Sequence, residues 1–69
     1  MIRLLIEERY GYRLYMMSNG FEKYFYITDL NDVFSIWDDN GKGKMFDSII
    51  EAAEAFDDAI NQMRREVSE

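Results

Sequence analysis

The chain has 69 residues, a net charge of −6, a hydrophobic content of 48% and an aromatic content of 16%. Such an apolar chain is not disordered, and its length predicts one small domain, spanning residues 1–69, that buries only about 60% of its unfolded surface. The sequence contains no cysteine and no histidine, which excludes disulfides, Ser-His and Cys-His catalysis and an ordinary zinc site.

The acidic character of the chain limits its partners. Its 14 acidic residues outnumber 8 basic ones, which disfavours binding to nucleic-acid phosphates or anionic membranes and permits binding to basic surfaces. No apolar run approaches the length of a membrane span, and Arg3 interrupts the apolar N-terminal residues in a way that a signal peptide does not show. We therefore expect a soluble, cytoplasmic protein.

Alternating apolar and polar residues predict strands along the first two thirds of the chain. We expect five, at about residues 2–8, 12–17, 21–28, 33–37 and 44–46. Asn19-Gly20 is typical of a tight hairpin turn, and the polar residues 38–43 give a second turn signal. Because all these connections are short, we expect an antiparallel meander of four to five strands.

The period of two also assigns the faces of these strands. Ile2, Leu4 and Ile6 share one face of the first strand. In the third strand the more apolar set is expected to face the core, and it consists of Phe21, Lys23, Phe25 and Ile27. Tyr24 and Tyr26 then lie on the opposite face.

The last third of the chain predicts one helix, at about residues 48–67. Ser48 is its expected N-cap, and Glu51 follows three residues later, which is the capping-box pattern. Apolar residues recur every three or four positions and form one stripe, consisting of Ile49, Ala52, Ala53, Phe56, Ala59, Ile60, Met63 and Val67. The sequence thus predicts an α+β fold in which a single C-terminal helix covers one face of the sheet.

Three patterns with possible chemistry fail in detail. Residues 41–44, Gly-Lys-Gly-Lys, lack the further glycine and the following helix of a phosphate loop. A calcium loop starting at Asp38 has Lys42 at its fifth position and Ile49 at its twelfth, where a bidentate glutamate belongs. Adjacent acids such as Asp57 and Asp58 are usually solvated. The sequence therefore predicts no catalytic residue, no metal site and no cofactor, and we expect a protein that is not an enzyme.

Two surfaces remain as candidates for binding. One helix covers only one face of a sheet, and the other face is expected to carry Leu5, Arg13, Tyr15, Met17, Tyr24, Tyr26, Val33 and Trp37. Tyrosine, tryptophan, methionine and arginine are enriched at interfaces. The helix also presents Glu51, Glu54 and Asp58 in a row that imitates a run of phosphates. The alternatives are a solvated helix face, and aromatic pairs that stabilise the sheet, form a homodimer or, less favoured, stack on RNA.

In this profile the chain resembles the small acidic inhibitor proteins of bacteriophages and mobile elements, including the anti-CRISPR group. The resemblance is one of size, acidity and aromatic surface, and it involves no shared motif. It implies inhibition by occlusion of the nucleic-acid-binding surface of a host defence protein in the host cytoplasm. The residues expected to bind a basic protein partner are Tyr15, Tyr24, Tyr26, Trp37, Glu51, Glu54, Asp57 and Asp58. The alternative is a small regulatory or housekeeping domain whose aromatic sheet face forms a homodimer.

Overall fold

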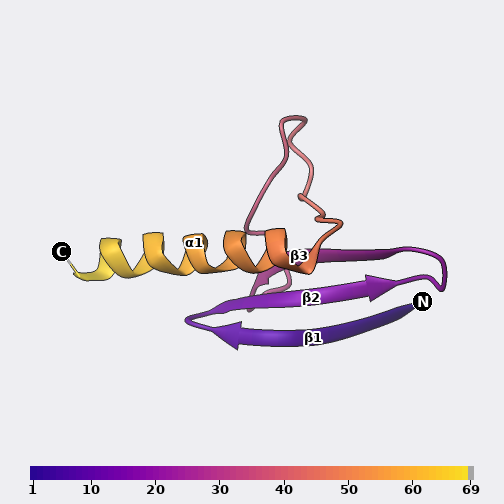
Figure 1. The fold of residues 1–69 in the computed structure, drawn as a ribbon. Helices are drawn as coiled ribbons and strands as arrows, with labels where there is room; N and C mark the ends of the chain where they lie inside the picture. Colours follow the sequence, from indigo (N-terminus) through magenta and orange to yellow (C-terminus); the bar gives the residue numbers. More distant parts are fainter. Residues whose placement is uncertain (69) are drawn as a thin grey trace.

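The computed structural model describes the backbone of residues 1–68 and the side chains of residues 1–62. It contains three strands, β1 (Ile2–Arg9), β2 (Tyr12–Ser18) and β3 (Lys23–Asp29), followed by one helix, α1 (Ile49–Ser68). The strands form an antiparallel sheet in the order β1-β2-β3. The helix lies across one face of this sheet and extends past the ends of the strands (Figure 1). The α+β class and the single C-terminal helix are as predicted.

The two hairpin turns follow from local chemistry. Tyr10 and Gly11, which join β1 to β2, both have positive φ angles, of 51° and 85°, as the two central residues of a type I′ turn require. Between β2 and β3, the Asn19 side-chain oxygen accepts hydrogen bonds from the backbone N–H groups of Phe21 and Glu22. These bonds keep Phe21 in the turn, where 98% of it is exposed. The prediction that Phe21 begins the third strand and faces the core is therefore wrong.

A bulge in β1 changes the predicted faces of that strand. Leu5 lies opposite Tyr15, but the next paired residue, Glu7, lies opposite Leu14, so that Ile6 is the extra residue. After the bulge the alternation is inverted. Glu7 therefore lies on the same face as Leu4, and not on the face of Leu5 that strict alternation predicts.

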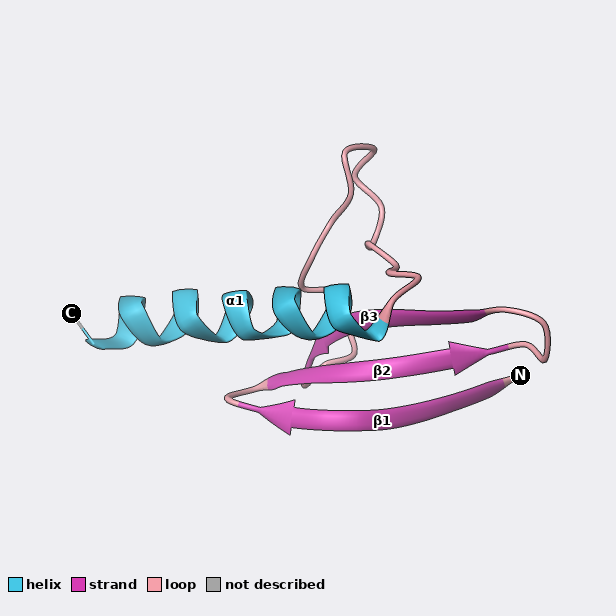
Figure 2. Ribbon diagram, viewed as in Figure 1, coloured by secondary structure: helices cyan, strands magenta, loops and turns pink. Residues whose placement is uncertain are grey.

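The sheet has three strands where four to five were predicted. Residues 33–37 and 44–46 lie in the long connection between β3 and α1, which projects from the body of the protein (Figure 2). These segments form only isolated bridges, of Phe34 to Thr28, of Phe46 to Phe25 and of Trp37 to Gly43. The first two bridges are made to the free edge of β3, one near each of its ends. The predicted fourth and fifth strands are thus replaced by isolated bridges, two of which cover this edge.

The helix and the inner face of the sheet form the core. The Ser48 hydroxyl accepts a hydrogen bond from the Ile50 N–H at 3.2 Å, which confirms Ser48 as the N-cap. The buried cluster joins β2, β3, the connection and α1, and consists of Leu14, Ile27, Phe46, Ala52, Phe56 and Ile60. Tyr12, Phe25, Ile36 and Ala55 pack against it. Of the predicted helical stripe, the side chains of Met63 and Val67 lie outside the described residues.

Candidate protein-binding surface

A row of aromatic rings crosses the outer face of the sheet, which is the face opposite α1. Tyr15 and Tyr26 are direct cross-strand neighbours, and their ring centroids are 5.5 Å apart in a stacked arrangement. Phe34, from the connection after β3, lies 5.3 Å from Tyr26, and Trp37 lies 6.3 Å from Phe34. We call these four residues the aromatic row. Their separations are typical of stabilising aromatic pairs.

An ion pair between Arg3 and Asp32 lies next to the Tyr15 end of this row. The Arg3 guanidinium lies 4.0 Å from the centroid of the Tyr15 ring. It also donates two hydrogen bonds to the Asp32 carboxylate, at 2.7 and 3.1 Å. Hydrogen bonding to Tyr15 and then to Asp32 raises the pKa of Arg3 further above its already high value. Because Arg3 is on β1 and Asp32 follows β3, their ion pair spans the two strands that carry the tyrosines.

The two central tyrosines are consequently buried. Only 7% of Tyr15 and 4% of Tyr26 is exposed, whereas the sequence places both on an open sheet face. Burial raises the pKa of Tyr26, because a low-dielectric environment disfavours the phenolate. The expectation that these two rings are exposed anchors is thus not met: any contribution they make to binding is through the residues packed against them.

The other two predicted anchors are more accessible. Trp37 ends the aromatic row and is 55% exposed. Tyr24 is half-buried on β3, and its hydroxyl donates a hydrogen bond to the Glu22 carboxylate. This bond raises the pKa of Tyr24, since it is made by the protonated phenol.

The acidic residues of α1 divide into two groups. Glu51, Glu54 and Asp58 are exposed, and we call them the acidic helix surface. The ion pairs among residues 1–62 use other carboxylates, namely those of Glu7, Glu8, Asp32 and Asp57. The acidic helix surface therefore keeps its charge uncompensated within this part of the chain.

Asp57 differs from the other helical acids because it has a basic partner. Its carboxylate accepts a hydrogen bond from Arg9 of β1 at 2.9 Å, and the Arg9 guanidinium also lies 5.5 Å from the centroid of the Phe56 ring. Hydrogen bonding to Glu7 is the main cause that raises the pKa of Arg9, and the bond to Asp57 adds to it. Asp57 thus connects α1 to β1, and its charge has a basic partner within the chain, which the acidic helix surface does not have among residues 1–62.

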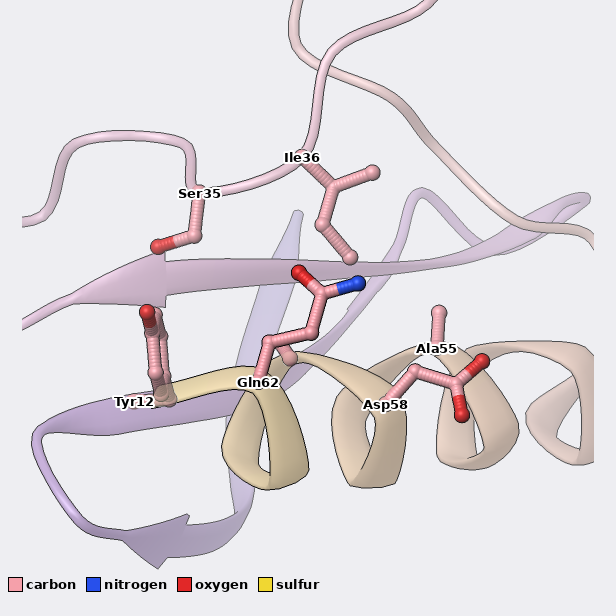
Figure 3. Close-up of a pocket in the computed structure, with 7 residues that line it drawn as sticks. Tyr12, Ser35, Ile36, Ala55, Asp58 and Gln62 are labelled. Atoms are coloured by element: carbon pink, nitrogen blue, oxygen red, sulfur yellow. The ribbon is translucent and has the colours of Figure 1, made fainter. Parts of the chain in front are cut away.

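A shallow cleft connects the helix to the segment that carries Trp37. Its volume is about 340 Å³, and it is lined by Tyr12, Ser35, Ile36, Ala55, Asp58, Ala59 and Gln62. Figure 3 shows Asp58 and Gln62 on the helix, facing the loop that holds Ser35 and Ile36. Since Trp37 directly follows Ile36, the exposed indole and the Asp58 carboxylate come from neighbouring segments.

Sequence reasoning missed Ser35 and Gln62 as lining residues of this cleft. No local signal marks them: the contact depends on how the connection folds back on α1. Among residues 1–62, no three side chains of the metal-ligating types come together. In the part of the chain that is described, no helix combines the length and the apolar character needed to cross a membrane.

Comparisons with known proteins give no match to a family model, to a curated protein or to a solved structure.

Proposed function

We propose that the chain is a non-enzymatic protein-binding module that binds a basic surface of its partner. The observation that carries this proposal is the acidic helix surface, where three exposed carboxylates lie on one rigid element. Their ionic partners are absent among residues 1–62, as shown by the pairs found there. Uncompensated charge of one sign attracts an oppositely charged partner and accelerates its association.

Trp37 supplies the apolar anchor of the proposed interface. Large aromatic residues contribute much of the binding energy at protein interfaces when a partner buries them. More than half of the Trp37 side chain is open to a partner, at 55% exposure, while its contact with Phe34 holds the indole in place. Tyr15 and Tyr26 then contribute indirectly, because Tyr15 packs against Tyr26 and Tyr26 packs against Phe34 in the aromatic row.

The partner that we propose is a nucleic-acid-binding protein of a host defence system, which the chain inhibits by occluding its basic surface. A row of carboxylates competes with phosphates for the same arginine and lysine side chains. The phage or mobile-element origin in this proposal rests on the resemblance in size, acidity and aromatic content. The alternative homodimer through the aromatic sheet face has less support, because the two central rings are already buried within one chain.

The proposal is tested by capture from a lysate of the source organism, followed by identification of the bound protein. Wild type is compared with Glu54→Lys and with Trp37→Ala, and we expect both changes to abolish or strongly reduce capture. Glu22→Lys is the matched control, because it changes the net charge equally but lies in the turn before β3 and not on α1. Equal capture by all four proteins would contradict the proposed interface.

A further inference from the structure

The strand β1 is exposed along its whole length. Every residue from Ile2 to Arg9 is exposed, and α1 packs on β2 and β3. The apolar side chains of β1 remain open, with exposures of 60% for Ile2, 53% for Leu4, 51% for Leu5 and 46% for Ile6. The opposite sheet edge, on β3, is covered by the bridges of the connection. A strand at an open edge with exposed apolar side chains is a template for pairing with another strand.

We propose that β1 pairs antiparallel with β1 of a second copy of this chain, forming a continuous six-stranded sheet. In the proposed register, Arg3 lies opposite Glu8 of the second copy, and Glu8 opposite its Arg3. Leu5 and Ile6 of each copy meet at the centre, next to the two-fold axis. This interface differs from the aromatic face, since it uses the backbone edge of β1.

The β1 bulge is what makes this register possible. A two-fold axis between antiparallel edge strands is perpendicular to the sheet, so that residues facing each other across the axis lie on the same face. In a strictly alternating strand, residues 3 and 8 lie on opposite faces. Because of the extra residue Ile6, Arg3 lies opposite Met17 and Glu8 opposite Arg13, and both belong to the outer face. The remaining pairs, Ile2 with Arg9 and Leu4 with Glu7, likewise share the inner face.

Charge complementarity identifies a second copy as the occupant of this edge. The register creates two symmetric Arg3–Glu8 pairs and places no like charges opposite each other. Arg3 already binds Asp32 at 2.7 Å, but a guanidinium has five N–H donors and can donate to a second carboxylate as well. Glu8 is held by Arg13 within its own chain, which orients its carboxylate on the outer face. Each junction would join the two ion pairs into one network.

The proposed dimer would bring two acidic helix surfaces to one face of the assembly. Both helices would lie on the same face of the six-stranded sheet, because the two-fold axis is perpendicular to it. The pair of β1 strands would separate them, with a spacing of about 5 Å between neighbouring strands.

A small strand-mediated interface of this kind is expected to be reversible and to depend on protein concentration.

Sedimentation equilibrium of the purified chain, alone and in mixtures, tests the proposal. We expect wild type to dimerise, and Arg3→Glu and Glu8→Arg each to raise the dissociation constant at least about tenfold, because each places two pairs of like charges opposite each other. An equimolar mixture of the two variants restores both complementary pairs in a heterodimer. We therefore expect the mixture to dimerise where neither variant alone does.

This mixture separates the proposed register from other causes. A change that merely damages the fold is not rescued by mixing, and circular dichroism of each variant checks the fold directly. If Arg3→Glu unfolds because it loses Asp32, Leu5→Lys serves instead, since Leu5 is 51% exposed and a lysine there brings two positive charges together at the axis. Glu54→Arg on α1 is the matched control and should leave dimerisation unchanged.

Three results would overturn the proposal: a wild type that stays monomeric at millimolar concentration, a mixture that associates no better than its components, or a Leu5→Lys chain that dimerises like wild type. Pairing of β1 with a peptide of another protein would appear as the first of these. The helix variants used to test the proposed function leave β1 unchanged, so the two proposals succeed or fail separately.

Discussion

Tyr26 distinguishes a residue that holds the fold together from one that binds a partner. Only 4% of it is exposed, and its ring contacts Tyr15 on one side and Phe34 on the other. Truncation of a buried aromatic residue to alanine costs about 3–5 kcal/mol. A 69-residue domain has a total stability of only about 3–10 kcal/mol. We therefore expect Tyr26→Ala to be close to unfolded in water.

The neighbouring Tyr24 is the internal control for this prediction. It lies two residues away on the same face of β3, is only half-buried, and bonds to an exposed carboxylate. We expect Tyr24→Ala to cost about 1 kcal/mol or less. In urea denaturation followed by circular dichroism, Tyr26→Leu provides a milder change if Tyr26→Ala does not fold. Equal midpoints for the Tyr24 and Tyr26 variants would refute the conclusion that the outer face is closed over Tyr26.

Three further predictions test the packing. Phe25→Ala should destabilise the fold, but by less than the about 3–5 kcal/mol expected for the fully buried Phe56→Ala, because Phe25 is half-buried; an unchanged denaturation midpoint would mean that the faces of β3 are reversed. Gly43→Ala should cost about 1–3 kcal/mol of stability, since its new Cβ would lie 2.3 Å from Phe34 Cγ. In a double-mutant cycle measured by urea denaturation, Phe34→Leu in the same chain should remove most of that cost. The pKa of Tyr26 is 10.0 in the unfolded chain and is raised by burial in the folded chain, so the unfolded chain loses this proton first as the pH rises. The free energy of unfolding should therefore fall above pH 10. Tyr26→Phe should reduce this fall, as measured by urea titrations at successive pH values.

The faces of β2 and β3 were predictable because a period of two is a local property. Leu14 and Ile27 are buried beneath the helix as predicted, and Ser48 caps the helix as predicted. The strand count was not predictable, because residues 33–37 have strand-like alternation whether or not they find a full partner. They make only two isolated bridges, of Phe34 to Thr28 on β3 and of Trp37 to Gly43 within the connection, so they do not form a full strand of the sheet.

The closed outer face had no signal in the sequence. Arg3 and Asp32 are 29 positions apart, and no local pattern relates an arginine at one strand edge to an aspartate beyond the other. The bulge at Ile6 was equally hidden, because residues 2–7 alternate well enough to suggest a regular strand. The acidic helix surface was predictable, since helical spacing alone places Glu51, Glu54 and Asp58 together. The ion pair of Asp57 was not predictable, because its partner Arg9 is 48 positions away.

The most direct test of the proposed function is displacement of nucleic acid from the captured partner. The partner is bound to a fluorescently labelled nucleic acid, the chain is added, and the anisotropy is followed. We predict that wild type and Glu22→Lys release the nucleic acid at similar concentrations, while Glu54→Lys and Trp37→Ala require at least about tenfold more. Absence of release by wild type, or release by Glu54→Lys at the wild-type concentration, would contradict binding through the acidic helix surface.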